Sequence, residues 1–240
     1  MERPPAIIPR IAAPLLFGAA IVLSFQLRAA PERLEPIELA SGEVPAPSAE
    51  ETRAAYASAL LPGAAGYDRG VTRAKVTVIE FADFGCRYCA RFTTESYPRI
   101  AAEFVATGRV RWRYVPFVLG MFSNGELAAR AAECAGEQGR AAFGRMHDRL
   151  YQRRDAWMNV ADPAALFGSI AGEAGLEPAR FASCYRGEAA GQRVRASNAL
   201  AERLGVFSTP TFFINGRRVE GALPADEFRA LLLEAIGGAT

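Results

Sequence analysis

Two cysteines are separated by two residues in the stretch FADFGCRYCARF, residues 81–92. A pair that exchanges disulfides needs one thiolate of lowered pKa and a second cysteine that resolves the mixed disulfide. Cys86 falls where a strand pattern gives way to a helical one, and a helix N-terminus offers a thiolate unpaired N–H donors and positive charge. Cys89 follows one turn later on the same face. The spacing predicts Cys86 as the nucleophile and Cys89 as the buried resolving cysteine. Between them, Arg87 adds positive charge and Tyr88 is expected at the rim.

Other uses of this cysteine pair have less support. A structural zinc site needs further cysteine or histidine ligands at a short spacing, but Cys134 and Cys184 are isolated in the sequence. His147 is the only histidine and is assigned no role. A permanent staple between Cys86 and Cys89 would close so short a loop that it would stabilise little. A non-catalytic module that holds copper(I) between the two sulfurs remains an alternative.

Glu80 interrupts the apolar run KVTVIEFAD six residues before Cys86. A charge on a central strand is costly unless it is functional or paired. A buried carboxylate beneath the dithiol, with a raised pKa, would be able to accept and return the proton of Cys89. The plainer interpretation is a glutamate in water at the edge of the sheet.

Pro210 begins the apolar run of STPTFFING, where proline is tolerated only at the end or edge of a strand. A cis bond between Thr209 and Pro210 would leave the backbone groups of Thr209 free to bond an extended substrate chain. Few X–Pro bonds are cis in folded proteins, so the residues alone do not establish this geometry.

The segments before and after the cysteines have the patterns of strands and helices. Residues 75–83 form a β-branched apolar run and residues 109–117 alternate, so both are predicted strands. A helix is predicted from Cys86 to about residue 107, with a kink at Pro98.

The rest of the chain is predicted to be an insertion followed by a hairpin and a helix. Helical patterns fill most of residues 120–204, and Asn215-Gly216 is a strong signal for a hairpin turn. Residues 224–236 have the pattern of an amphipathic helix. A strand–helix–strand start with a hairpin–helix finish predicts an α/β thioredoxin fold, a mixed sheet flanked by helices, with an inserted all-helical subdomain.

The N-terminal segment is typical of an exported protein. Residues 11–27 are uncharged and mostly apolar, and follow basic residues. As a helix they would span roughly 26 Å, just short of a hydrocarbon core. The local cleavage pattern is poor, which favours an uncleaved anchor over a cleaved signal. We therefore divide the chain into a signal-anchor or signal peptide at 1–28, a Pro/Glu-rich tether with a short helix at 29–69, and the folded domain at 70–240.

Composition narrows the choice of partners. The 240-residue chain carries a formal charge of +2, which gives no indication of nucleic-acid binding. Export would place the domain in the periplasm or at the cell exterior, where disulfides persist. Cys134 and Cys184 are then predicted to form a structural disulfide, with two buried thiols or a redox relay as alternatives.

These features together resemble the DsbA-like thioredoxin-fold proteins, which are exported bacterial thiol:disulfide oxidoreductases. The resemblance runs from about Asp68 to Ile236 and rests on EFADFGCRYC, the helical insertion and GVFSTPTFFINGRRVEGA. It implies that Cys86 is the nucleophile, Cys89 the resolver, Pro210 the adjacent cis-proline and Glu80 the buried acid.

The resemblance also implies partners and leaves one question open. Substrates would be unfolded or partly oxidised exported proteins, and a quinone-linked membrane thiol oxidase (or reductase) would reset the pair. No metal or organic cofactor is implied, and a monomer is expected. Arg87-Tyr88 stands where the best-known members have Pro-His, and Thr209 also occurs in isomerase-type relatives. Both positions tune the redox potential, so they leave the direction of electron flow open: an oxidase is the first expectation, and an isomerase or reductase is the alternative.

Overall fold

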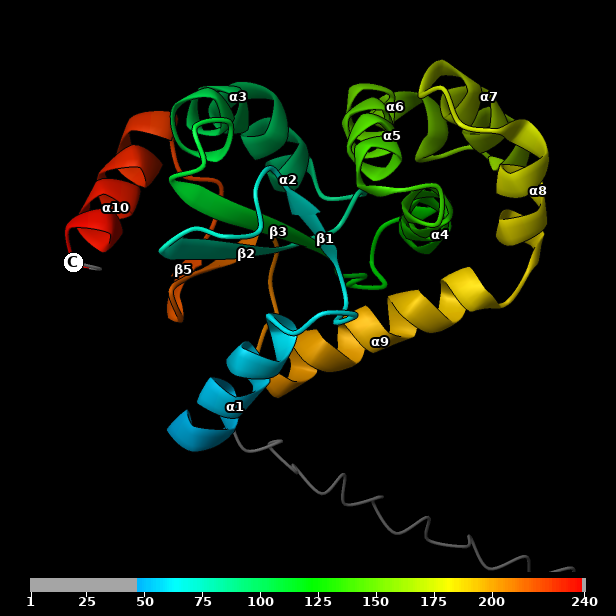
Figure 1. The fold of residues 1–240 in the computed structure, drawn as a ribbon. Helices are drawn as coiled ribbons and strands as arrows, with labels where there is room; N and C mark the ends of the chain where they lie inside the picture. Colours follow the sequence, from blue (N-terminus) through cyan, green and yellow to red (C-terminus); the bar gives the residue numbers. More distant parts are fainter. Residues whose placement is uncertain (1–46, 239–240) are drawn as a thin grey trace, which may run out of the picture. The chain divides into compact units, whose positions relative to one another are not determined.

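A five-stranded mixed sheet organises the molecule (Figure 1). The computed structural model describes residues 47–238. The strand order is β1-β3-β2-β4-β5; β2 and β3 are parallel at the centre, and every other pair is antiparallel. The predicted mixed sheet is therefore confirmed. The strands are β1 (Tyr67–Arg69), β2 (Val76–Ala82), β3 (Val110–Pro116), β4 (Thr211–Ile214) and β5 (Arg217–Glu220).

The helix that follows Cys86 changes its winding along its length. It consists of α2 (Arg87–Arg91), the π-helical segment η1 (Phe92–Ser96), α3 (Tyr97–Ile100) and a second π-helical segment η2 (Ala101–Val105). Pro98 lies in the first turn of α3. Because proline has no N–H for the i→i−4 bond, the regular ladder cannot continue there. A kink was predicted at Pro98; the structure instead has a π-helical segment on each side of the short helix α3 that contains it.

Between β3 and β4 the chain forms the inserted helical subdomain, close to the predicted limits of residues 120 and 204. Buried alanines along α4 let α5 and α9 approach it closely. The helices are α4 (Gly125–Gly136), α5 (Arg140–Gln152), α6 (Arg154–Trp157), α7 (Ala164–Glu173), α8 (Pro178–Arg186) and α9 (Ala189–Arg203).

Helices cover both faces of the sheet. On one face, Val78 and Trp112 pack with Phe228 of the C-terminal helix α10 (Ala225–Gly237), beside α3 (Figure 1). On the other, Ile79 packs with Leu200 of α9. Since successive residues of a strand point to opposite faces, β2 is buried on both sides along its whole length. The hairpin turn at Asn215-Gly216 has positive φ at both residues, as predicted.

The folded domain begins before the predicted boundary at residue 70. β1 pairs with β3 in the sheet. The short helix predicted in this region is α1 (Ala49–Ala59); a capping box of Ser48 and Glu51 begins it, and it buries two alanines against the face covered by α9. Residues 47–69 therefore belong to the domain, because β1 gains backbone bonds and α1 buries apolar surface. The predicted anchor and residues 29–46 of the predicted tether lie outside the described residues, among which no helix is long and apolar enough to cross a membrane.

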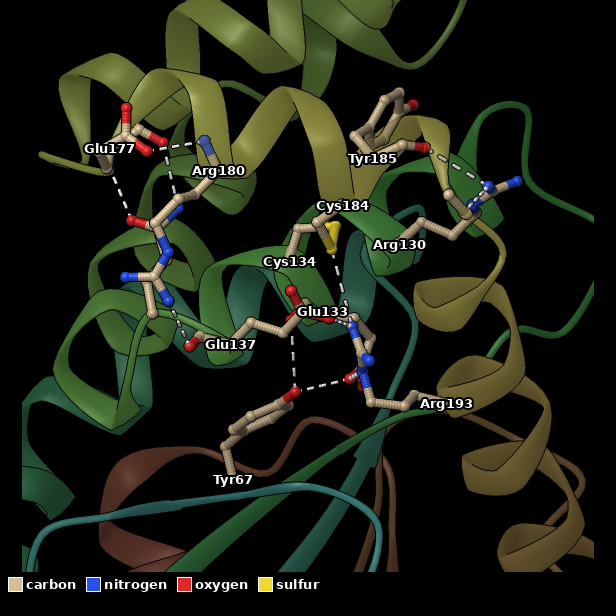
Figure 2. Close-up of a disulfide and its surroundings, with 12 residues drawn as sticks. Tyr67, Arg130, Glu133, Cys134, Glu137, Glu177, Arg180, Cys184, Tyr185 and Arg193 are labelled. Carbon is tan, nitrogen blue, oxygen red and sulfur yellow. Dashed lines mark hydrogen bonds and ion pairs between the residues drawn. A yellow bond between two sulfur atoms is a disulfide. The ribbon is translucent and has the colours of Figure 1, made fainter.

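A disulfide joins Cys134 of α4 to Cys184 of α8, as predicted (Figure 2). The two Cα atoms are 5.6 Å apart and 50 residues separate the cysteines in sequence. Cys134 is fully buried in the core of the insertion. The bond therefore ties together two helices whose connection is long.

Replacing both cysteines of this pair by alanine is expected to lower the free energy of unfolding by about 2–4 kcal/mol, since the crosslink restricts a long loop in the unfolded chain. Urea unfolding of the full-length protein, before and after the change, measures this. An unchanged unfolding midpoint would show that the crosslink does not stabilise the insertion.

Candidate active site

Cys86 lies at the start of α2, as its N-cap residue, directly after β2 and a three-residue loop. Its backbone is extended and its carbonyl accepts the first helical bond, from Ala90 N at 3.0 Å. Cys89 comes one turn later on the buried side of the helix. Cys86 retains 3% of its surface and Cys89 none, so Cys86 is the cysteine open to solvent. Both are free thiols.

The loop before Cys86 is held by two residues that sequence reasoning missed. The buried Asp83 carboxylate accepts hydrogen bonds from Gly85 N at 2.8 Å and Leu119 N at 2.9 Å. Arg154 Nε, from the inserted subdomain, donates to Gly85 O at 2.9 Å. These bonds tie the loop to two distant segments and fix where Cys86 enters the helix. The only local signal was the second carboxylate, three residues after Glu80.

The two thiols have opposite pKa shifts. The pKa of Cys86 is lowered to about 5, first because the Cys89 thiol hydrogen-bonds to its sulfur. Thr209 and backbone N–H groups at the helix start lower it further and outweigh the effect of burial. Burial, and then the Cys86 thiolate itself, raise the pKa of Cys89. At neutral pH the reduced pair therefore holds one thiolate, on Cys86, as the helix position predicted.

The loop before β4 brings a cis peptide bond to the cysteines. The Thr209–Pro210 bond is cis. Thr209 O accepts a hydrogen bond from Cys86 Sγ at 3.4 Å, although 123 residues separate the two in sequence. The geometry suggested for Pro210 is thus present, and Thr209 touches the nucleophile.

Glu80 lies in the core and not at a solvated edge. Its side chain is 2% exposed and shares a face of the sheet with Trp112, whose Nε1 donates to Glu80 Oε2 at 2.8 Å. Burial raises the pKa of Glu80 to about 7, against the opposing effects of Trp112 and Arg69. Glu80 Oε1 has no partner. Within residues 47–238, no hydrogen bond joins Glu80 to either cysteine, and its placement beneath the pair stays a prediction.

Two buried tyrosine hydroxyls, those of Tyr114 and Tyr151, lie beside the strand and loop that lead to Cys86. Tyr114 OH and Tyr151 OH are 2.9 Å apart, and they donate to Ala82 O and Asp83 O in the strand and loop before Cys86. Burial raises the pKa of Tyr114, and the charges of Glu80 and Cys89 raise it further. Tyr114 lies opposite Glu80 in the register of β2 and β3, and it packs in the same core cluster as Cys89. The same two charges act on Tyr151.

Exposed apolar side chains lie on the segments that form the site. Tyr88 is two residues after Cys86, Phe207 precedes the cis bond and Met121 belongs to the loop bonded to Asp83; they are 43%, 69% and 73% exposed. The Arg87 guanidinium packs on the Tyr88 ring, 4.7 Å from its centroid, and hydrogen-bonds its hydroxyl. Tyr88 is therefore a rim residue as predicted. Arg87 contacts Tyr88, and the charges of Arg87 and Cys86 interact.

A strand–loop–helix with two cysteines, one pKa lowered and one raised, beside a cis-proline defines a thioredoxin-type redox centre. A family model described as thioredoxin matches residues 65–234, so the chain belongs to the thioredoxin family. Within that family it is DsbA-like, as the resemblance of its motifs and its helical insertion predicted.

Individual relatives agree with this assignment. Disulfide bond formation protein D of Bacillus subtilis is 24% identical over 170 residues, 70% of this chain and 76% of that protein. The crystal structure of α-DsbA1 from Wolbachia pipientis has the same fold, with a TM-score of 0.66 and 22% identity over 75% of this chain and 94% of that one.

A longer relative also matches. The Na(+)/H(+) antiporter NhaA 3 of Salinispora tropica is 34% identical over 173 residues, 71% of this chain. This chain spans only 25% of that antiporter's length. The copper(I) alternative finds no support in these three relatives.

Proposed function

We propose that this protein is an exported thiol:disulfide oxidoreductase that acts as an oxidase and donates the Cys86–Cys89 disulfide to reduced substrate chains. The observation that carries the direction of transfer is the stabilised Cys86 thiolate, with its pKa of about 5. A pair whose reduced form is stabilised gives up its disulfide readily, because reduction releases a good leaving group. The disulfide bond formation protein among its relatives supports the same direction.

The transfer takes two exchange steps. A substrate thiolate attacks Cys86 Sγ, the Cys86–Cys89 bond breaks, and its electron pair leaves on Cys89 Sγ. A second substrate thiolate then attacks the substrate sulfur of the mixed disulfide, and Cys86 departs as a thiolate. The substrate loses two electrons and the cysteine pair gains them. The low pKa of Cys86 favours the second step, because a more acidic thiol leaves faster.

Cys89 must gain a proton when its bond breaks, because burial strongly disfavours its thiolate. Glu80, with a pKa near 7, is suited to give and recover a proton at neutral pH. The Tyr114 and Tyr151 hydroxyls, on which the charges of both groups act, are proposed to supply hydrogen-bonding positions between them. We therefore assign Glu80 the role of exchanging a proton with Cys89 through these hydroxyls.

The substrate chain is proposed to lie across the rim. The exposed Tyr88, Phe207 and Met121 offer apolar contacts to an unfolded chain. The Thr209–Pro210 segment, beside Cys86, would hold that chain in line with the attacked sulfur. Export to an oxidising compartment accords with the Cys134–Cys184 disulfide, and a membrane quinone-linked thiol oxidase would restore the active pair.

The reduction potential of the Cys86–Cys89 pair tests this proposal. Full-length protein equilibrated with glutathione is expected to give a value around −120 mV, that of a strong oxidant. The Cys134→Ala/Cys184→Ala protein is the matched control, since only the active pair can titrate in it. A potential near −270 mV in both proteins would instead describe a reductase, or an isomerase kept reduced, and the oxidase proposal would fail.

A further inference from the structure

A hollow of about 720 Å³ lies apart from the cysteines and has no part in the proposed disulfide exchange. Its walls come from the connection between α1 and β1, from β3 and from α4, α5 and α9. This volume is within the range of small-molecule sites. Figure 2 shows one wall, where Glu133 of α4, Arg193 of α9 and Tyr67 of β1 point toward one another. None of the active-site residues lines it.

The charge of the lining is strongly positive. Five arginines line the hollow against two carboxylates. The arginines are Arg73, Arg111, Arg113, Arg140 and Arg193, and the carboxylates are Asp68 and Glu133.

Both carboxylates are already neutralised by partners. Asp68 accepts hydrogen bonds from Arg111 Nε at 2.8 Å and Arg113 Nη1 at 3.1 Å. Glu133 Oε2 accepts from Tyr67 OH at 2.6 Å and Arg193 Nε at 3.0 Å (Figure 2). The acidic groups therefore do not cancel the charge of the remaining arginines.

Three donors of the lining have no partner among the described residues. Arg73 and Arg140 are exposed, come from different segments, and make no side-chain hydrogen bond or ion pair with any described residue. The Ser197 hydroxyl is 1% exposed and has no partner either. A buried polar group without a partner costs free energy, which a bound acceptor would recover.

One stretch of the wall is apolar. Leu60, Leu61, Pro62 and Ala64 follow one another along it, and Leu61 is 59% exposed. Apolar walls with a few convergent donors are the usual composition of a site for a small organic ligand. From this lining we propose that the hollow binds a small organic anion, with its carboxylate or phosphate group on Arg73, Arg140 and Ser197 and a short apolar body on the wall of Leu60 to Ala64.

Titration calorimetry on the full-length protein at low salt tests the site with four probes: benzoate, phenyl phosphate, inorganic phosphate and benzyl alcohol. At least one of the two aromatic anions is expected to bind more tightly than both inorganic phosphate and benzyl alcohol. Tighter binding of benzoate would identify a carboxylate ligand, and tighter binding of phenyl phosphate a phosphate ester. Binding of benzyl alcohol as tight as that of the anions would show an apolar hollow only and overturn the proposal, as would no binding of any probe.

Three variants separate the site from the general positive charge of the surface. Arg73→Gln/Arg140→Gln is expected to weaken binding of the better anion by about a hundredfold, about tenfold for each charge-assisted hydrogen bond lost. Ser197→Ala is expected to weaken it by several fold, as for one neutral hydrogen bond.

The matched control is Arg186→Gln/Arg203→Gln, which removes the same charge from two exposed arginines outside the hollow that have no side-chain partner among the described residues. This control is expected to leave Kd unchanged. If the two double variants weakened binding equally, the anion would be held by the general positive charge of the surface, and the proposed site would be wrong.

Discussion

Replacing Cys86 with serine is expected to lower disulfide transfer to a reduced substrate by more than about a thousandfold, because the remaining thiol, that of Cys89, is fully buried and its pKa is raised. A serine hydroxyl stays protonated at neutral pH and forms no S–S bond. Cys86 is also the only member of the pair that keeps exposed surface. The measurement is the rate at which a reduced, unfolded substrate with two cysteines regains its disulfide in the presence of the full-length variant.

Cys89→Ser is the matched control for that experiment. It leaves Cys86 free to attack an oxidised substrate, so a stable mixed disulfide should accumulate and appear by mass spectrometry. The pKa of Cys86 should rise in this variant, because the Cys89 thiol is the largest cause of its lowering. If Cys86→Ser retained transfer, or if the mixed disulfide formed through Cys89, the assignment of nucleophile and resolver would be wrong.

Glu80→Gln is expected to raise the free energy of unfolding by about 3 kcal/mol at pH 8 and to leave it nearly unchanged at pH 4. The folded protein raises the pKa of this carboxyl from 4.5 to about 7, mainly through burial. A carboxyl with a raised pKa contributes its full stability below the unfolded pKa of 4.5. That stability is lost as pH rises through 7, because the buried group must then ionise. Glutamine resembles the neutral acid and avoids this loss.

Urea unfolding across this pH range measures the difference between the two proteins. Glu95→Gln is the matched control, since Glu95 is exposed on the same helix as the cysteines and has no side-chain partner among the described residues. The control should leave the pH dependence as it is. Parallel stability curves for wild type and Glu80→Gln would mean that Glu80 has an ordinary pKa and is unsuited to proton exchange at neutral pH.

The same variant separates the role of Glu80 in exchange from its effect on stability. If Glu80 gives its proton to Cys89, Glu80→Gln should slow reduction of the active disulfide about a hundredfold at neutral pH, in a protein that is more stable than wild type. If the variant were more stable but reduction of the active disulfide were as fast as in wild type, Glu80 would destabilise the fold without taking part in the exchange.

Much of the redox centre is determined by residues close together in the sequence. Cys86 and Cys89 are one helical turn apart, and the donors that stabilise a thiolate belong to that same turn. Strand and helix periodicity extends over single segments, so β2, β3 and the β4–β5 hairpin were predicted to within a few residues. β1 was missed because a strand of three residues is too short to show a period.

The sequence by itself determined the fold class, the reactive cysteines and the order of the elements, because those depend on local spacing. Only the tertiary structure decided what surrounds them. It brings Thr209 to Cys86 across 123 residues, ties the loop before Cys86 to Arg154, and buries Glu80 against Trp112. Hydrogen bonds and burial between distant segments depend on how side chains pack in three dimensions, and no spacing along the chain encodes them.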